Sequence, residues 1–176
     1  MLRSKGTLKI TQGALIAALY VVLTVTFAPI SYGVVQVRIA EALTILPLFT
    51  PAAIPGLFVG CILGNLLGGA IPLDVIFGSL ATLIGALGTW AIGKKIRSAH
   101  LSKAVKYTLP IPPIAMNTIV VPLILYYGYG INIPIPIQML TVGFGEILSC
   151  GVIGMILLFS LEKVGGKVFQ PQETEI

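Results

Sequence analysis

The sequence predicts an all-α integral membrane protein, with six transmembrane helices in a single domain over residues 1–176. Of its residues, 56% are hydrophobic and only 10% are charged, and the mean hydropathy is +1.01. Soluble domains carry about 25% charged residues, so a water-soluble fold of this length could not cover such a sequence with polar surface. Its apolar runs are also long enough to span a bilayer.

The positions of the basic residues predict the number of spans and their orientation. Basic residues precede the first apolar run (Arg3, Lys5, Lys9), form a central cluster over residues 94–106, and follow the last run (Lys163, Lys167). Six spans place all three clusters on one side, which the positive-inside rule assigns to the cytoplasm together with both termini. Because the net charge of +5 lies in these connections, a nucleic-acid partner is not expected.

The predicted helices follow from the apolar runs and from the prolines and glycines that separate them. They are expected over about residues 9–29, 34–49, 53–69, 72–93, 107–127 and 137–161. The first has the charged head of a signal peptide, but its apolar stretch is too long and lacks a small-residue cleavage site, so it is expected to be retained. Prolines at positions 110, 112 and 113 are expected to break the start of the fifth helix.

Small residues recur at helical spacing on the first and third predicted helices. The third carries glycine every four residues, at Gly56, Gly60, Gly64 and Gly68. A stripe without side chains predicts backbone-to-backbone packing against a neighbouring helix. On the first helix, Ala14 and Ala18 predict either close packing within this protein or docking to a separate membrane subunit.

Asp74 heads a similar stripe on the fourth predicted helix. Gly78, Ala81, Gly85 and Gly88 follow it, so the stripe and its carboxylate are expected to face the interior of the bundle. The alternative for Asp74 is a helix N-cap, because aspartate accepts hydrogen bonds from the free N–H groups of a first turn.

Arg38 and Glu41 are the most informative charged residues of the chain. They lie three residues apart in the apolar run 35–45, which places them on one face of the predicted second helix. A charge at the centre of a membrane helix costs at least about 2.5 kcal/mol. Such residues are therefore expected to serve a function.

The predicted topology brings the polar membrane residues toward the extracellular half, with Glu146 near the midplane. We expect them to form a substrate pocket open to the outside. The candidate substrate-binding residues are Gln36, Arg38, Glu41, Asn65, Asp74, Asn117 and Glu146. One guanidinium leaves two of the three acids uncompensated, which favours a ligand with a positive charge or several N–H donors. The alternative is an internal salt-bridge network in which the spare acids are protonated.

No catalytic, metal or cofactor site is predicted. Cys61 and Cys150 lack metal-ligand spacing and are expected to be packing residues, and His100 is expected to be solvated. Residues 88–95 lack the Ser/Thr of a phosphate-binding loop. Residues 143–146 share a glycine–x–glycine–acid pattern with intramembrane aspartyl peptidases, but the chain lacks the paired aspartates of such an enzyme.

Three stretches carry a family resemblance: VQVRIAEAL at 35–43, GCILGN at 60–65 and DVIFGSLATL at 74–83. They resemble the QueT family, the substrate-binding S-components of energy-coupling factor (ECF) transporters assigned to queuosine precursors. The resemblance covers almost the whole chain. It implies an ECF S-component-like bundle of six helices that captures its substrate outside the cell and topples in the membrane to release it inward.

The resemblance also implies partners and a substrate class. S-components dock through small residues on their first helix, a pattern that Ala14 and Ala18 match. The partners would be a transmembrane coupling subunit and two ATPase subunits of an ECF module. A substrate similar to 7-aminomethyl-7-deazaguanine (preQ1), its nitrile counterpart (preQ0) or queuine would suit an acid-rich pocket, because it brings N–H donors and in some forms a cationic amine.

Two other transport functions are compatible with the sequence. The chain is either an S-component for another small nitrogenous vitamin, or a standalone carrier that uses its buried acids as a proton relay. No inverted repeat is visible, which counts against the carrier.

Overall fold

The computed structural model describes residues 5–31, 36–98 and 103–164, which are helical almost throughout. The described elements are α1 (Lys5–Thr26), α2 (Ala28–Ser31), η1 (Ile39–Leu48), α3 (Ala53–Leu67), η2 (Asp74–Gly78), α4 (Ser79–Ser98), η3 (Lys103–Thr108), α5 (Ile111–Tyr127), α6 (Ile135–Glu146), η4 (Ile147–Ile153) and α7 (Gly154–Val164). Of these, η1 and η3 are 3₁₀ helices, and η2 and η4 are π-helical. The expected start of the second helix at residue 34, the loop position of His100 and the polar tail from residue 170 lie outside the described residues.

Helix length and composition support the predicted membrane class. In the part of the chain that the structure describes, four helical stretches are long and apolar enough to cross a membrane: Gly6–Thr26, Asp74–Ile96, Ala104–Tyr127 and Ile135–Val164. Two further apolar helices, η1 and α3, are shorter. The predicted all-α membrane protein is therefore confirmed, and the count of six spans stays a prediction.

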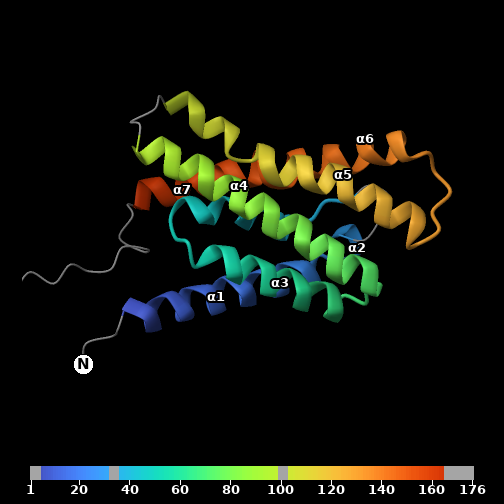
Figure 1. The fold of residues 1–176 in the computed structure, drawn as a ribbon, viewed down its shortest axis with the longest axis horizontal. Coiled ribbons are helices and arrows are strands. Elements are labelled where there is room, and N and C mark those ends of the chain that lie inside the picture. The colour runs from blue at the N-terminus through green and yellow to red at the C-terminus, as the bar shows by residue number, and fades with distance from the viewer. Residues whose placement is uncertain (1–4, 32–35, 99–102, 165–176) are drawn as a thin grey trace, which may run out of the picture.

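Successive segments run in alternating directions along the long axis of the molecule (Figure 1). The left end of that view holds the start of α1 and the ends of α4 and α7. The right end holds the ends of α3 and α5 and the start of α6. The lysines that flank the apolar stretches belong to the left end, because Lys9 lies near the start of α1, Lys94 and Lys95 near the end of α4, and Lys163 near the end of α7. This shared end is the arrangement that the positive-inside rule requires.

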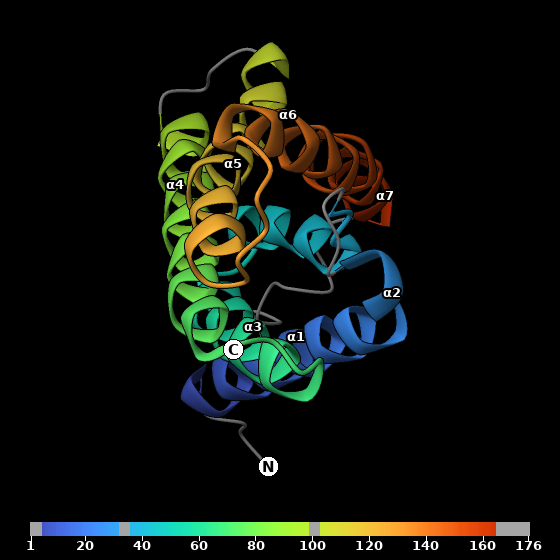
Figure 2. The ribbon, with the colours of Figure 1, turned by 90° about the vertical axis from the view of Figure 1, so that its right-hand side faces the viewer.

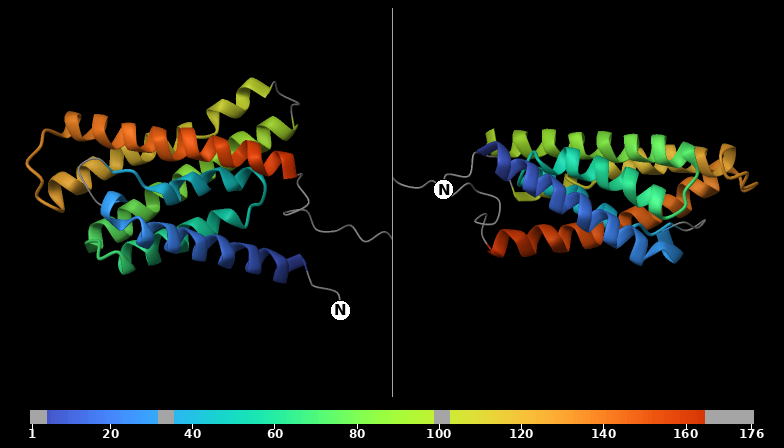
Figure 3. Two further views of the ribbon diagram at one scale, coloured as in Figure 1. Left: turned by 180° about the vertical axis from the view of Figure 1, so that it is seen from behind. Right: turned by 90° about the horizontal axis from the view of Figure 1, so that it is seen from below.

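η1 lies in the middle of the bundle. Seen along the long axis, it is enclosed between α1 and α3 on one side and α6 and α7 on the other (Figure 2), and the view from behind agrees (Figure 3). Its residues from Ala40 to Pro47 are all buried. The segment that carries Glu41 is thus the central element of the fold.

The outer faces of the bundle are apolar and its interior is partly polar. Leu140 is 74% exposed and Leu67 68% exposed, and they are two of many large apolar side chains on the surface. Ionisable and amide side chains such as Glu41 and Gln138 are instead fully buried. This inverted distribution is typical of a chain whose helices face lipid.

The glycine stripe of α3 packs against α1, as predicted. A Cβ added at Gly60 would lie 2.8 Å from the Cβ of Tyr20 and 3.0 Å from the backbone of Ala17. At Gly56 it would lie 2.6 Å from the carbonyl oxygen of Gly13. Real Cβ atoms do not come so close, so only glycine permits this separation of the two helices.

The stripe on α4 faces the interior, also as predicted, and packs against the proline-rich start of α5. A Cβ at Gly85 would lie 2.7 Å from the Cα of Pro113, and one at Gly88 2.5 Å from the Cβ of Pro112. The start of the predicted fifth helix is broken at these prolines. The 3₁₀ helix η3 ends at Thr108, and α5 begins at Ile111, directly after Pro110.

The prediction of one regular helix over 34–49 is wrong. The helix begins at Ile39, and Arg38 is extended with φ −86° and ψ 91°. The Val37 N–H donates to the carbonyl of Ile30 at 2.9 Å. The Gln36 carbonyl packs directly against Gly145, so closely that it would overlap a Cβ at that position. Residues 36–38 are therefore not helical, and Arg38 and Glu41 do not share a helix face.

Gly60→Ala tests the contact between α1 and α3. The added methyl group meets backbone atoms of Ala17, which cannot move without shifting α1, so we expect the free energy of unfolding to fall by about 1–3 kcal/mol. Gly151→Ala is the matched control, because its Cβ would lie 3.6 Å from the nearest atom of Ile147, an ordinary contact. Unfolding in mixed detergent micelles, followed by circular dichroism, measures both. Equal losses in the two variants would contradict the tight α1–α3 contact.

Candidate functional site

All seven side chains predicted to bind substrate lie inside the bundle. They are Gln36, Arg38, Glu41, Asn65, Asp74, Asn117 and Glu146, and each is at most 3% exposed. The sequence predicts that they line a pocket open to the outside, which stays a prediction. The structure divides them into two neighbouring groups, one around Asp74 and one around Glu41 and Glu146.

The first group centres on an ion pair between Arg38 and Asp74. The Arg38 guanidinium donates to the Asp74 carboxylate at 3.0 Å, and the Tyr129 hydroxyl lies 3.4 Å from the same oxygen. Asn65 donates to the backbone carbonyl of Asp74 at 3.2 Å. The alternative of an N-cap does not apply to Asp74, because the preceding residue, Leu73, is already helical and the carboxylate is paired with Arg38.

Tyr129 approaches this ion pair from the connection between α5 and α6. Its hydroxyl accepts from the Ile71 N–H at 3.3 Å. Burial raises the pKa of Tyr129 above its ordinary value, so the phenol keeps its proton at neutral pH. It therefore acts as a donor toward Asp74.

The second group begins with Glu41 on η1. One carboxylate oxygen, Oε1, accepts from the hydroxyl of Tyr20 on α1 and from that of Thr82 on α4, the latter at 2.8 Å. The other oxygen, Oε2, is buried and has no hydrogen-bond partner among the described residues. Two hydroxyls from different helices thus fix the orientation of the Glu41 carboxylate and leave one acceptor free.

Glu146 and Cys150 complete this second group. The Cys150 thiol lies 3.3 Å from Glu146 Oε2 and 3.4 Å from the backbone oxygen of Glu41. One oxygen of each carboxylate and the Cys150 sulfur all lie within 4.8 Å of one another. Asn117 neighbours the Glu146 carboxylate, and its amide nitrogen is buried without a hydrogen-bond partner in the described part of the chain.

The charges of the two groups do not balance. Among the described residues, the salt bridge of Arg38 is with Asp74. Within residues 5–31, 36–98 and 103–164, the only other salt bridge is the exposed pair of Lys106 and Glu162, at 2.5 Å. Glu41 and Glu146 are therefore two buried acids without a basic side chain bound to either.

Four contributors to the site were missed by sequence reasoning: Tyr20, Thr82, Tyr129 and Cys150. Cys150 follows Glu146 by four residues on the same helix, a spacing that could have indicated their contact. Tyr20 lies deep in an apolar helix instead of at an interface, which is an unusual place for a hydroxyl and was a usable signal. Thr82 and Tyr129 carried no such signal.

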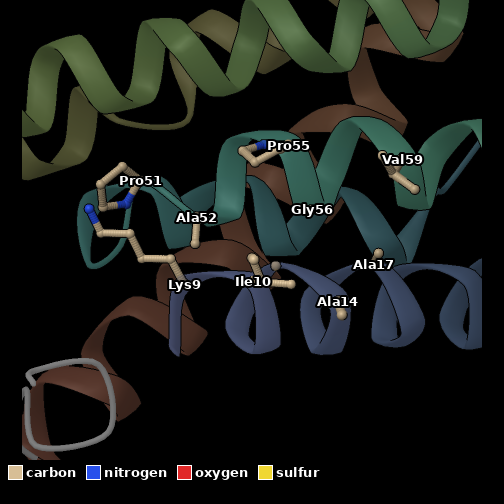
Figure 4. Close-up of a pocket in the computed structure, with 10 residues that line it drawn as sticks. Lys9, Ile10, Ala14, Ala17, Pro51, Ala52, Pro55, Gly56 and Val59 are labelled. Carbon is tan, nitrogen blue, oxygen red and sulfur yellow. The ribbon is translucent and has the colours of Figure 1, made fainter. Parts of the chain in front are cut away.

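A separate apolar groove lies between α1 and α3 on the outside of the bundle (Figure 4). Its volume is about 510 Å³. Its lining is formed by Lys9, Ile10, Gly13, Ala14, Ala17, Pro51, Ala52, Pro55, Gly56 and Val59. Of the two predicted docking residues, Ala14 lines this groove, and Ala18 is exposed on α1 without lining it.

Comparison with known proteins gives two matches in sequence. A sequence model of the QueT transporter family matches residues 10–163. The queuosine precursor transporter QueT of Lactococcus lactis subsp. cremoris (strain MG1363) is 38% identical over 85 residues. That alignment covers 47% of this chain and 50% of the relative, so the chain spans about half the length of the curated protein it matches. No solved structure matches the chain.

Asp74→Asn tests whether the ion pair with Arg38 is a structural element. The substitution leaves the buried guanidinium without a counter-charge, so we expect the free energy of unfolding to fall by about 3–5 kcal/mol. Glu162→Gln breaks the more exposed pair with Lys106 and is expected to cost about 0–1 kcal/mol. Both are measured by detergent unfolding, and a loss for Asp74→Asn as small as that of the control would contradict the structural role.

Proposed function

Since the chain belongs to the QueT transporter family, we propose that it is the substrate-binding S-component of an ECF importer. Its substrate is a queuosine precursor of the 7-deazaguanine class, such as preQ1, preQ0 or queuine, taken up from the extracellular side. The name of the Lactococcus lactis relative supports this substrate class. Membership of a transporter family makes the chain a non-enzymatic membrane transport protein.

The observation that carries the proposal is the pair of uncompensated acids inside the bundle. Glu41 and Glu146 offer buried acceptors, and a buried carboxylate is stable only when N–H or O–H donors or a positive charge meet it. A deazaguanine presents several N–H donors along its ring edge. A site built to accept such donors rejects analogues that lack them, because its acceptors would then remain unpaired.

The remaining candidates surround these two acids. Asn117 supplies a free amide beside Glu146, and Gln36 and Asn65 contribute to the walls of the site. Arg38 and Asp74 form an ion pair at the border of the site, and we propose that the Arg38 guanidinium also meets a carbonyl oxygen of the ligand. None of these residues requires a bound metal or organic cofactor for this role.

We further propose six membrane passes with both termini in the cytoplasm. The four long helices supply four passes, and η1 and α3 supply the two shorter ones. η1 is too short to face lipid along its whole length, but it is enclosed by other helices. The extended residues before it suit this arrangement, because non-helical backbone at membrane depth is tolerated only where protein or a cavity surrounds it.

Uphill transport needs a source of free energy, because a binding site of equal affinity on both sides only equalises the substrate concentrations. We propose that two ATPase subunits supply it through a transmembrane coupling subunit that docks in the groove between α1 and α3. Small residues such as Ala14 and Gly56 let a partner helix approach closely there. Substrate release then follows from reorientation of the S-component in the membrane.

The neighbouring acids favour a second candidate, a standalone proton-coupled carrier. Two buried carboxylates with oxygens within 4.8 Å of each other could accept a proton in turn, as a relay requires. Uptake of a 7-deazaguanine into liposomes that contain only this chain, abolished by collapse of the proton gradient, would favour the carrier over the S-component.

The proposed substrate role predicts the effect of neutralising either acid. In Glu41→Gln and Glu146→Gln, we expect affinity for 7-aminomethyl-7-deazaguanine to fall at least about 30-fold, since a buried charged contact contributes about 2 kcal/mol or more. Glu162→Gln, on the exposed Lys106 pair, is the control and leaves affinity unchanged. Isothermal titration with purified protein measures all of them. Unchanged affinity in both site variants would contradict the assigned roles, and no binding by the unmodified chain would contradict the function.

The proposed docking surface predicts a separate effect. Ala14→Phe fills the groove, so we expect uptake with the complete ECF module to fall by about tenfold while ligand binding by the isolated chain is unchanged. Ala18→Phe is expected to act in the same direction.

Leu15→Phe is the matched control for this experiment, because Leu15 is 60% exposed on the same helix but does not line the groove. Radiolabelled uptake in cells and co-purification with the coupling subunit give the two readouts. Equal uptake in the Ala14 and Leu15 variants would contradict the docking surface.

A further inference from the structure

We propose that Glu41 and Glu146 form a subsite for one positively charged amine, so that this protein selects a cationic deazaguanine over a neutral one of the same ring. This inference rests on the proposed function and adds to it. It assigns the charge selectivity to two named acids and excludes the third, Asp74.

The contacts already separate the three acids. Asp74 is committed to Arg38 at 3.0 Å and its carboxylate is also approached by Tyr129. Glu41 and Glu146 are each at most 1% exposed, and no basic side chain in the described ranges forms a salt bridge with either of them. Two adjacent acids in a water-poor interior attract a single positive charge more strongly than either acid would alone.

The spacing of the two carboxylates suits an ammonium group. A charge-assisted N–H···O hydrogen bond is about 2.7–2.9 Å long, so one nitrogen can contact two oxygens up to about 5.4–5.8 Å apart. One oxygen of Glu41 and one of Glu146 lie within 4.8 Å of each other. A single amine nitrogen can therefore bind both acids at normal distances.

The local contacts also hold Glu41 ready for such a ligand. Tyr20 and Thr82 both donate to Oε1, which leaves Oε2 as the free acceptor. Each hydroxyl comes from a different helix, so the carboxylate is fixed from two sides. Preorganised acceptors of this kind bind a cationic donor with little further loss of side-chain freedom.

The same three side chains could ligate a metal ion, but their neighbours fit an organic cation better. The Cys150 thiol lies within hydrogen-bonding distance of two oxygen acceptors, Glu146 Oε2 and the Glu41 carbonyl, and so acts as a protonated donor. A metal ion requires the thiolate. Next to Glu146, the Asn117 amide nitrogen is a donor that no metal ion can satisfy, because a metal ion offers no acceptor. A heterocycle that carries both a cationic amine and ring acceptors can satisfy the acids and this donor together.

Two ligands with the same ring test the inference on the full-length chain. Isothermal titration compares 7-aminomethyl-7-deazaguanine, which is cationic, with 7-cyano-7-deazaguanine, which is neutral. We expect the unmodified protein to bind the aminomethyl compound at least about tenfold more tightly. In Glu41→Gln and Glu146→Gln this preference is expected to drop below about threefold, mainly through weaker binding of the aminomethyl compound. Glu162→Gln is the control and keeps the full preference.

Each other result overturns the inference. If the unmodified chain binds both compounds with equal affinity, it has no charge selectivity, but the proposed function stands. If both glutamine variants still prefer the aminomethyl compound, other residues are responsible for the charge selectivity. Binding of neither compound removes the proposed function as well. Should a glutamine variant fail to fold, Glu41→Asp and Glu146→Asp replace it, because they keep the charge but move the carboxylate oxygens back by one methylene group. If these variants lower the affinity for both compounds equally, the subsite is also overturned.

Discussion

The fold depends on the burial of two charged residues in and next to its central helix. Glu41 lies on η1, which other helices enclose, and Arg38 directly precedes it. A buried charge is tolerated only when other groups compensate it, so each must find partners on neighbouring elements. Glu41 is held by Tyr20 from α1 and Thr82 from α4, and Arg38 by Asp74 from η2. The requirement to compensate two charges therefore joins η1 and the residue before it to α1, α4 and η2.

Irregular helical segments accompany all three buried acids. Glu41 lies in a 3₁₀ helix, Asp74 in a π-helical turn, and Glu146 immediately before a second π-helical stretch that contains Cys150. Because 3₁₀ and π turns hold a different number of residues from an α turn, they rotate the following side chains relative to a regular helix. Such turns change which side chains face the interior of the bundle, while the flanking residues still present an apolar surface. Such segments occur frequently at functional sites.

The parts of the fold that sequence could predict are those encoded by period or composition. The glycines of α3 and α4 recur at helical spacing, and both stripes pack as that spacing indicates. The pairing of Arg38 could not be predicted in this way, because its partner Asp74 is 36 residues away and the helix assumed to carry both charges begins only at Ile39. The contact between Glu41 and Cys150 spans 109 residues, and nothing local to either residue encodes it. Tertiary contacts thus decide which acids are paired, whereas the sequence shows only that acids are present.

The two faces of α1 allow the two proposed roles of the chain to be examined separately. Tyr20 is buried and donates to Glu41, whereas Ala14 is exposed and lines the outer groove. A side chain added at Ala14 therefore projects away from the acids and leaves their hydrogen bonds in place. Neutralising Glu41 changes the interior without altering the groove surface. A methyl group added at Gly60 would already meet the backbone of Ala17, so this tight contact opposes sliding of α1 along α3. We therefore expect each variant to report on its own face of α1.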